Sequence, residues 1–194
     1  MRALTNFCDA IFSGIEQVTV PLMTTLARFI FAAVLLIYYW NSGLTKLGEG
    51  VLGFFFPSDG AYIQILPKTV EAAGYDFSQL GTTHWLIVTA GTWSEFVLPL
   101  LIVVGLFTRL AALGMIGFIA IQSWVDLFGH GGIANGTLGS WFDRFPDGLI
   151  LDQRAFWVFV LLYLVLRGGG PLSIDRMLRN GSSVHLDDRQ PLQG

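Results

Sequence analysis

The sequence predicts an all-α integral membrane protein whose helices form a four-helix bundle. Of its 194 residues 53% are hydrophobic and 13% are charged, whereas a soluble domain is roughly a quarter charged. The mean hydropathy is +0.61. Four separate apolar segments are each close to the ~20 residues that cross a hydrocarbon core ~30 Å thick. Residues 1–180 are therefore expected to form a single membrane domain.

The segment that precedes the first apolar stretch is predicted to be an amphipathic helix on the membrane surface. Its apolar residues recur every three or four positions, which is the spacing of one helix face. These residues are Leu4, Phe7, Ile11, Ile15 and Val18. Acidic residues interrupt the segment and no cleavage pattern follows it, so it is not typical of a signal peptide. An N-terminus without regular structure is the alternative.

Four membrane spans are predicted, joined by two long connections and one very short one. The spans are expected at about residues 22–40, 85–107, 110–128 and 153–167. The short connection makes the second and third spans an antiparallel hairpin. The first long connection, residues 41–83, is too rich in Gly and Pro for a span and too apolar for a solvated linker. It predicts short interfacial helices, such as one from Ala61 to Ala73.

The basic residues are distributed unevenly between the two predicted sides of the membrane. With both termini in the cytoplasm, the cytoplasmic side holds Arg2, Arg28, Arg109, Arg167, Arg176, Arg179 and Arg189, and the outer side holds Lys46, Lys68, Arg144 and Arg154. This excess favours cytoplasmic termini, because basic loops remain on the cytoplasmic side. The polar tail at residues 181–194 is predicted to be disordered.

Glu95 is an acidic residue inside the second predicted span. An ionised carboxylate at mid-span costs about 2.5 to 3.5 kcal/mol on insertion scales, so it should face protein and be paired. Arg28 in the first span is the preferred counter-charge, and Lys46, which approaches from the opposite interface, is the alternative. The pair either holds the helices together or serves as a proton-relay or ligand-binding site.

A second group of polar residues is expected at the outer mouth of the bundle. His84 begins the second span, Asp126 ends the third, and His130 follows four residues after Asp126. The spacing of four places the latter two on one helix face if the helix continues. Two histidines and a carboxylate could bind a transition metal or polarise a quinone carbonyl. The alternative is a set of ordinary interfacial polar residues at helix ends.

Several classes of function are excluded or disfavoured by composition. The single cysteine, Cys8, cannot form an internal disulfide or a multi-cysteine metal site. No haem-attachment or nucleotide-binding motif occurs, so no tightly bound cofactor is expected. The net charge of −3 and the lack of a Lys/Arg block argue against a nucleic-acid partner. The lipid bilayer and, in addition, a protein partner or a second copy of the chain remain as partners.

Three stretches of the chain together resemble the DoxX family of small four-span bacterial membrane proteins. They are "ARFIFAAVLLIYYWNSGLTKL", "SEFVLPLLIVVGLFTRLAAL" and "LLYLVLRGGGPLSIDRML". The positions that match the family pattern are Arg28, Gly43, Lys46, Glu95, Gly105, Arg109 and Asp175. The chain departs from the pattern in its enlarged first loop and in the "DLFGHG" outer segment.

The resemblance implies a location in the bacterial inner (plasma) membrane and an association with redox systems. Relatives include the membrane part of thiosulfate:quinone oxidoreductases. We therefore expect an accessory subunit of a membrane redox system that acts with a redox partner and has no catalytic activity alone. A quinone head group is the ligand considered for the bundle interior. A small transporter-like module and a purely structural assembly protein are the alternatives.

Overall fold

The computed structural model describes residues 19–187 of the chain. These residues form helices and no β-strand, with isolated β-bridges in two loops, which confirms the all-α prediction. Three helices are long and apolar enough to cross a membrane: Thr19–Leu44, α5 (Thr82–Val104), and Thr108–Gly129, which joins α6 (Thr108–Trp124) to the π turn η4 (Val125–Gly129). The chain is thus a membrane protein, as its composition indicates.

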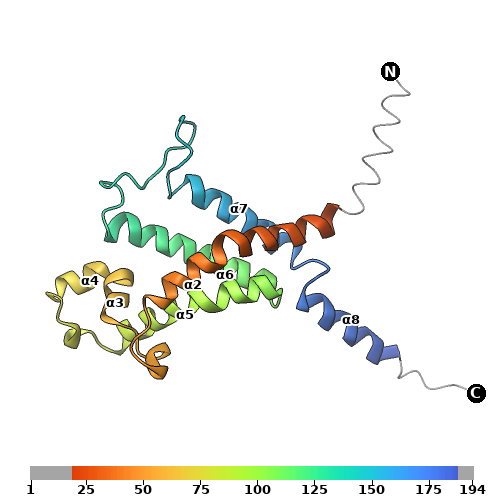
Figure 1. Ribbon diagram of the computed structural model, residues 1–194, viewed down its shortest axis with the longest axis horizontal. Helices are drawn as coiled ribbons and strands as arrows, with labels where there is room; N and C mark the ends of the chain where they lie inside the picture. The colour runs from red at the N-terminus through yellow and green to blue at the C-terminus, as the bar shows by residue number, and fades with distance from the viewer. Residues whose placement is uncertain (1–18, 188–194) are drawn as a thin grey trace, which may run out of the picture.

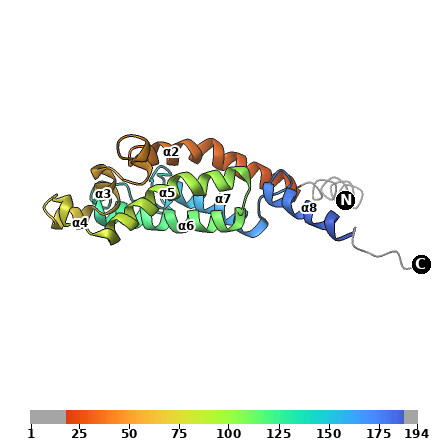
Figure 2. The same cartoon turned by 90° about the horizontal axis from the view of Figure 1, so that it is seen from below.

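A fourth helix, α7 (Asp152–Arg167), completes the bundle. It occupies the place predicted for the fourth span and packs along α6. The first long helix contains the π turn η1 (Ala32–Leu36) and α2 (Ile37–Leu44), and it packs on α5. The four helices run side by side along the long axis of the molecule (Figures 1 and 2).

The bundle buries one side of each helix and leaves large apolar side chains on its outside. The core contains Ala27, Phe31, Leu35, Tyr39, Ile102, Ala111, Ala112, Met115, Ile119, Leu161 and Leu164. On the outer surface Ile121, Phe156 and Phe159 are 67%, 70% and 69% exposed. Such an apolar exterior is disfavoured in water and suits contact with lipid.

Short helices occupy the first long connection. They are η2 (Val51–Phe54), α3 (Asp59–Ile65), α4 (Pro67–Ala72) and η3 (Phe77–Gln79). The single helix expected from Ala61 to Ala73 is in fact two, because Pro67 has no N–H to continue the hydrogen-bonding pattern and restricts Leu66 before it. Figure 1 shows α3 and α4 at the end of the bundle opposite α8.

The last helix, α8 (Ile174–Asp187), leaves the bundle at its other end (Figure 1). A connection that begins with three glycines, residues 168–170, separates it from α7. The prediction of a disordered tail from residue 181 is therefore wrong for residues 181–187, which continue this helix. The predicted surface helix at the N-terminus falls within residues 1–18, outside the described part of the chain.

Candidate functional site

Glu95 forms a buried ion pair with Lys46. The distances from Lys46 Nζ to Glu95 Oε2 and Oε1 are 3.0 and 3.1 Å, and the two side chains are 5% and 4% exposed. Ser42 Oγ donates to Glu95 Oε1 at 3.1 Å and accepts from Lys46 Nζ at 2.8 Å. The ammonium group also donates to the Ser42 carbonyl at 3.1 Å. The carboxylate within the span is thus neutralised by a partner that follows the first long helix.

The close approach of two helices brings this group together. A Cβ built on Gly43 would lie 2.6 Å from the ring of Phe96, so only glycine lets the end of α2 lie this close to α5. Ser42 and Glu95 are the sequence neighbours of these two residues. Lys46 comes one helical turn after Ser42, just past the end of α2, and its side chain folds back toward the bundle. The local sequence around Gly43 therefore sets the geometry of the pair.

The preferred prediction for the counter-charge was wrong, because Arg28 binds main-chain carbonyls instead of Glu95. Its guanidinium donates to the Ile102 carbonyl at 3.0 Å and to the Val103 carbonyl near the end of α5. It also donates to the carbonyls of Gly169 and Leu172, at 3.0 and 2.9 Å. The last carbonyls of a helix have no partner within the helix and attract cations. Arg28 therefore joins the first helix to the end of α5 and to the segment after α7.

The Lys46–Glu95 pair lies in the wall of a cavity of about 500 Å³ between the N-terminal half of α5 and the C-terminal half of α6. Apolar side chains supply much of the wall, with Ile65 from α3 at one side. The complete lining is Ser42, Lys46, Gln64, Ile65, Ile87, Ala90, Gly91, Ser94, Glu95, Phe118, Ile121, Gln122, Val125, Asp126 and His130. A volume of ~300–1,000 Å³ with a few convergent polar groups is typical of a small-molecule site.

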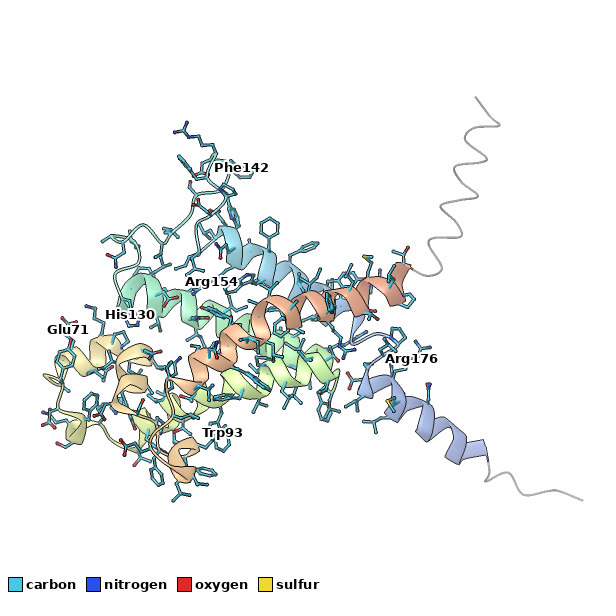
Figure 3. All side chains as sticks on the ribbon, viewed as in Figure 1. Glu71, Trp93, His130, Phe142, Arg154 and Arg176 are labelled. Carbon is cyan, nitrogen blue, oxygen red and sulfur yellow. The ribbon has the colours of Figure 1, made fainter. Side chains whose placement is uncertain are left out.

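A second ion pair involves Asp126, another residue of the cavity lining. Arg154, whose side chain is 4% exposed, donates to Asp126 Oδ2 at 2.5 Å and to Ser123 Oγ at 2.7 Å. Figure 3 shows Arg154 at the start of α7, inside the bundle. The π turn η4 carries Asp126, and such turns often occur at functional sites because they reorient side chains. Arg154 thus stabilises the carboxylate that faces the cavity.

The structure brings together two members of the predicted outer-mouth group and leaves the third outside. Asp126 and His130 both line the cavity, whereas His84, at the start of α5, does not. His130 Nε2 lies 3.0 Å from the Gln64 carbonyl, which links the end of η4 to α3 (Figure 3). Among the described residues no group of three or more His, Cys, Asp or Glu side chains could hold a metal ion.

Sequence reasoning did not identify Ser42, Gln122 or Arg154 as members of the site. Arg154 had a detectable signal: it is a cation in the first turn of an apolar helix, where it needs a partner, and Asp126 ends the preceding span. Ser42 and Gln122 had none, because isolated polar residues near helix ends are common. Gln122 Oε1 accepts a long hydrogen bond of 3.4 Å from the buried Tyr39 hydroxyl.

Comparison with known proteins bears on this geometry. A search of curated proteins and a search of solved structures returned no match. The DoxX family model matches residues 23–125, which is more than half of the chain and includes both members of the Lys46–Glu95 pair. The chain therefore belongs to the DoxX family.

Proposed function

We propose that this protein is an accessory subunit of a membrane redox system and that its cavity binds a quinone head group. The observation that carries the proposal is the buried Lys46–Glu95 pair in the wall of an otherwise largely apolar cavity. A buried ion pair contributes little net stability compared with apolar residues of similar size. Intramembrane ionisable groups commonly mark ligand or proton pathways.

The chemistry of the pair suits both redox forms of a quinone. An ammonium donates to the carbonyl oxygen of a quinone, and a carboxylate accepts from the hydroxyl of a quinol. Lys46 and Glu95 offer both groups at one point of the wall. Ile65, Ile87 and Phe118 offer apolar surface to the ring. The pair can therefore hold either form with only a shift of hydrogen bonds.

The position of the cavity favours a ligand that arrives from the bilayer. Ile87 and Ile121 line it and are also 46% and 67% exposed on the outer surface of α5 and α6. Within a membrane such exposed apolar residues face lipid. An amphiphile can place its head beside Lys46 while its apolar tail stays between these helices and the lipid. A soluble polar solute gains nothing from this apolar edge.

Family membership and the sequence support the proposed accessory role. The chain has a single cysteine and lacks the motif for covalent haem attachment, so the electrons are supplied or accepted by a partner protein. We place the protein in the bacterial inner membrane with both termini in the cytoplasm. Cysteine labelling from the two sides of the membrane at Ser58 and at Met177 should then give opposite accessibility.

Ligand-dependent thermal unfolding of the purified full chain tests the cavity. Decylubiquinone at about a hundredfold excess over Kd should stabilise the protein by about 2.7 kcal/mol. Ala90→Phe fills the cavity and should abolish this stabilisation. Val97→Phe is the matched control, because Val97 is 46% exposed on the same helix and does not line the cavity. Equal stabilisation of both variants would refute binding in this cavity.

The role as a subunit is tested separately, by mild-detergent pull-down and by deletion. Loss of this protein should reduce the membrane-bound activity of its redox partner more than the soluble activity of that partner. A preparation of the chain alone that turns over an electron acceptor would contradict the accessory role. Vectorial uptake of a solute by proteoliposomes of the chain alone would instead support a transporter.

A further inference from the structure

A second cavity, at the opposite end of the bundle from the Lys46–Glu95 pair, is lined by arginines. It has a volume of about 430 Å³ and lies where the turn between α5 and α6, the end of α7 and the start of α8 meet. Its charged lining residues are Arg109, Arg167, Arg179 and Asp175. Three guanidinium groups and one carboxylate give this lining a net charge of +2. The cavity therefore favours an anion.

The carboxylate in this lining is already engaged by the main chain. Asp175 Oδ1 accepts from the Phe107 N–H at 2.7 Å, and Oδ2 accepts from the Thr108 N–H and hydroxyl at 2.9 and 2.7 Å. These donors belong to the start of α6, where free N–H groups attract an acid. Asp175 consequently forms no ion pair within 4.0 Å of any arginine in residues 19–187.

The three arginines are exposed, and the Arg179 charge acts on Asp175 only from beyond ion-pair distance. In the described residues none of Arg109, Arg167 and Arg179 forms a hydrogen bond or an ion pair within the chain. Arg28, by contrast, is buried, and its guanidinium donates to four carbonyls. The guanidinium fork presents several donors that match the oxygens of a phosphate group.

The surroundings of the arginines are apolar and lie at the ends of long apolar helices. Phe107 and Leu110, at the start of α6, are 62% and 69% exposed, and Leu178 on α8 is 59% exposed. Leu178 and Arg179 also line the cavity. Ile174, Met177 and Leu178 share the spacing of one face of α8, whose start is marked by Arg176 in Figure 3. A helix with an apolar face and basic neighbours lies in the plane of the membrane interface.

We propose that this cavity binds the phosphodiester head group of an anionic phospholipid. The three guanidinium groups contact the phosphate oxygens, while the acyl chains lie against the exposed apolar residues at the start of α6 and on α8. Basic pockets between spanning helices bind anionic head groups in this way. Charge and apolar surface are both required, and together they distinguish a lipid from a free anion. The site is separate from the proposed quinone cavity and does not depend on it.

Lipid binding by the full chain, purified in an uncharged detergent, tests this proposal. Native mass spectrometry measures retained dioleoylphosphatidylglycerol, with dioleoylphosphatidylcholine as the neutral competitor. Each arginine removed should weaken binding of the anionic lipid about fivefold, and the three together about a hundredfold. The pocket variant is Arg109→Gln/Arg167→Gln/Arg179→Gln. Its thermal unfolding without lipid should remain close to that of the wild type, because all three side chains are exposed.

A control variant removes the same amount of charge outside the cavity. Lys68→Gln/Arg144→Gln/Arg176→Gln should keep the preference for the anionic lipid, because none of these residues lines the cavity. A variant with lysine at the three pocket positions retains the charge and should bind more strongly than the glutamine variant. Equal losses in the pocket and control variants would refute the site. Inorganic phosphate that displaces the lipid at equal concentration would also refute it, because the apolar contacts would then contribute nothing.

Discussion

Breaking the Lys46–Glu95 pair from one side should cost far more stability than removing both charges. Lys46→Met leaves the Glu95 carboxylate buried with only the Ser42 hydroxyl as a donor. Glu95→Gln leaves the Lys46 ammonium buried without a counter-charge, with only neutral acceptors, the Ser42 oxygens and the introduced amide oxygen, beside it. Each single change strands a charge whose side chain is about 5% exposed or less. Removing one partner of a buried pair costs about 3 to 5 kcal/mol.

The double variant Lys46→Met/Glu95→Gln replaces both charges by neutral side chains of similar size. Because no unpaired charge remains, its loss should be about 1 to 2 kcal/mol, within the range for a lost buried hydrogen-bond group. The sum of the two single losses is about 6 to 10 kcal/mol. The coupling free energy should therefore be at least about 4 kcal/mol, which is above the ~0.5 to 3 kcal/mol usual for contacting residues.

Equilibrium unfolding in mixed detergent micelles, at constant total detergent, gives the four free energies of this cycle. The exposed Lys68–Glu71 pair is the matched control, because its N–O distance of 2.9 Å is similar while its side chains are 68% and 60% exposed. An ion pair exposed to water contributes little, so the coupling free energy of the Lys68–Glu71 cycle should be close to zero. Additive losses for Lys46 and Glu95 would refute the claim that a buried, mutually neutralised pair lies at this site.

Three further predictions concern the opposite end of the bundle. Arg28→Gln and Arg28→Lys should each destabilise the protein by about 3 kcal/mol, because neither side chain replaces the guanidinium bonds to four carbonyls; denaturation of both variants measures this. Asp175→Ala should cost about 1 kcal/mol at pH 7. Burial raises the pKa of Asp175, but hydrogen bonds from Thr108 and Phe107 lower it by more, so its pKa lies below the ordinary value. The difference in unfolding free energy between the wild type and this variant should therefore be constant above about pH 4 and disappear as the pH falls through the lowered pKa. Gly105→Ala should destabilise the protein by at least about 1 to 2 kcal/mol, since Gly105 has φ of +75° and a Cβ there would lie 2.6 Å from the Ser173 Cβ. Thermal unfolding measures this, with Gly117→Ala as the control because the space around Gly117 is open.

The burial of Glu95 could be predicted from sequence because the cost of a charge in lipid depends only on its place in an apolar segment. The partner of Glu95, which is Lys46, could not be predicted in this way. Whether Arg28 or Lys46 meets Glu95 depends on the relative depth of two helices, and that depth is set by the close contact of Gly43 with Phe96. It also depends on carbonyls at the end of α5, which compete for Arg28. Hydropathy contains neither piece of information.

The helices themselves were predicted well where apolar segments are long and less well at their ends. The break at Pro67 and the continuation of α8 to Asp187 depend on local backbone geometry. The cavity could not be predicted, because it combines α3, which lies in the first connection, with η4 at the end of the third span. His130 and Gln64, which join these two elements, are 66 positions apart in the chain.

Photo-crosslinking with an azido-quinone in native membranes, followed by peptide mapping, tests the central claim most directly. We expect labelling of peptides from residues 82–104 and 108–129, since α5 and α6 with η4 supply most of the cavity wall. Excess decylubiquinone should suppress the labelling, Ala90→Phe should abolish it, and Val97→Phe should leave it unchanged. Labelling that excess quinone does not reduce, or that follows lipid exposure and falls mainly on the outer face of α7, would contradict quinone binding in this cavity.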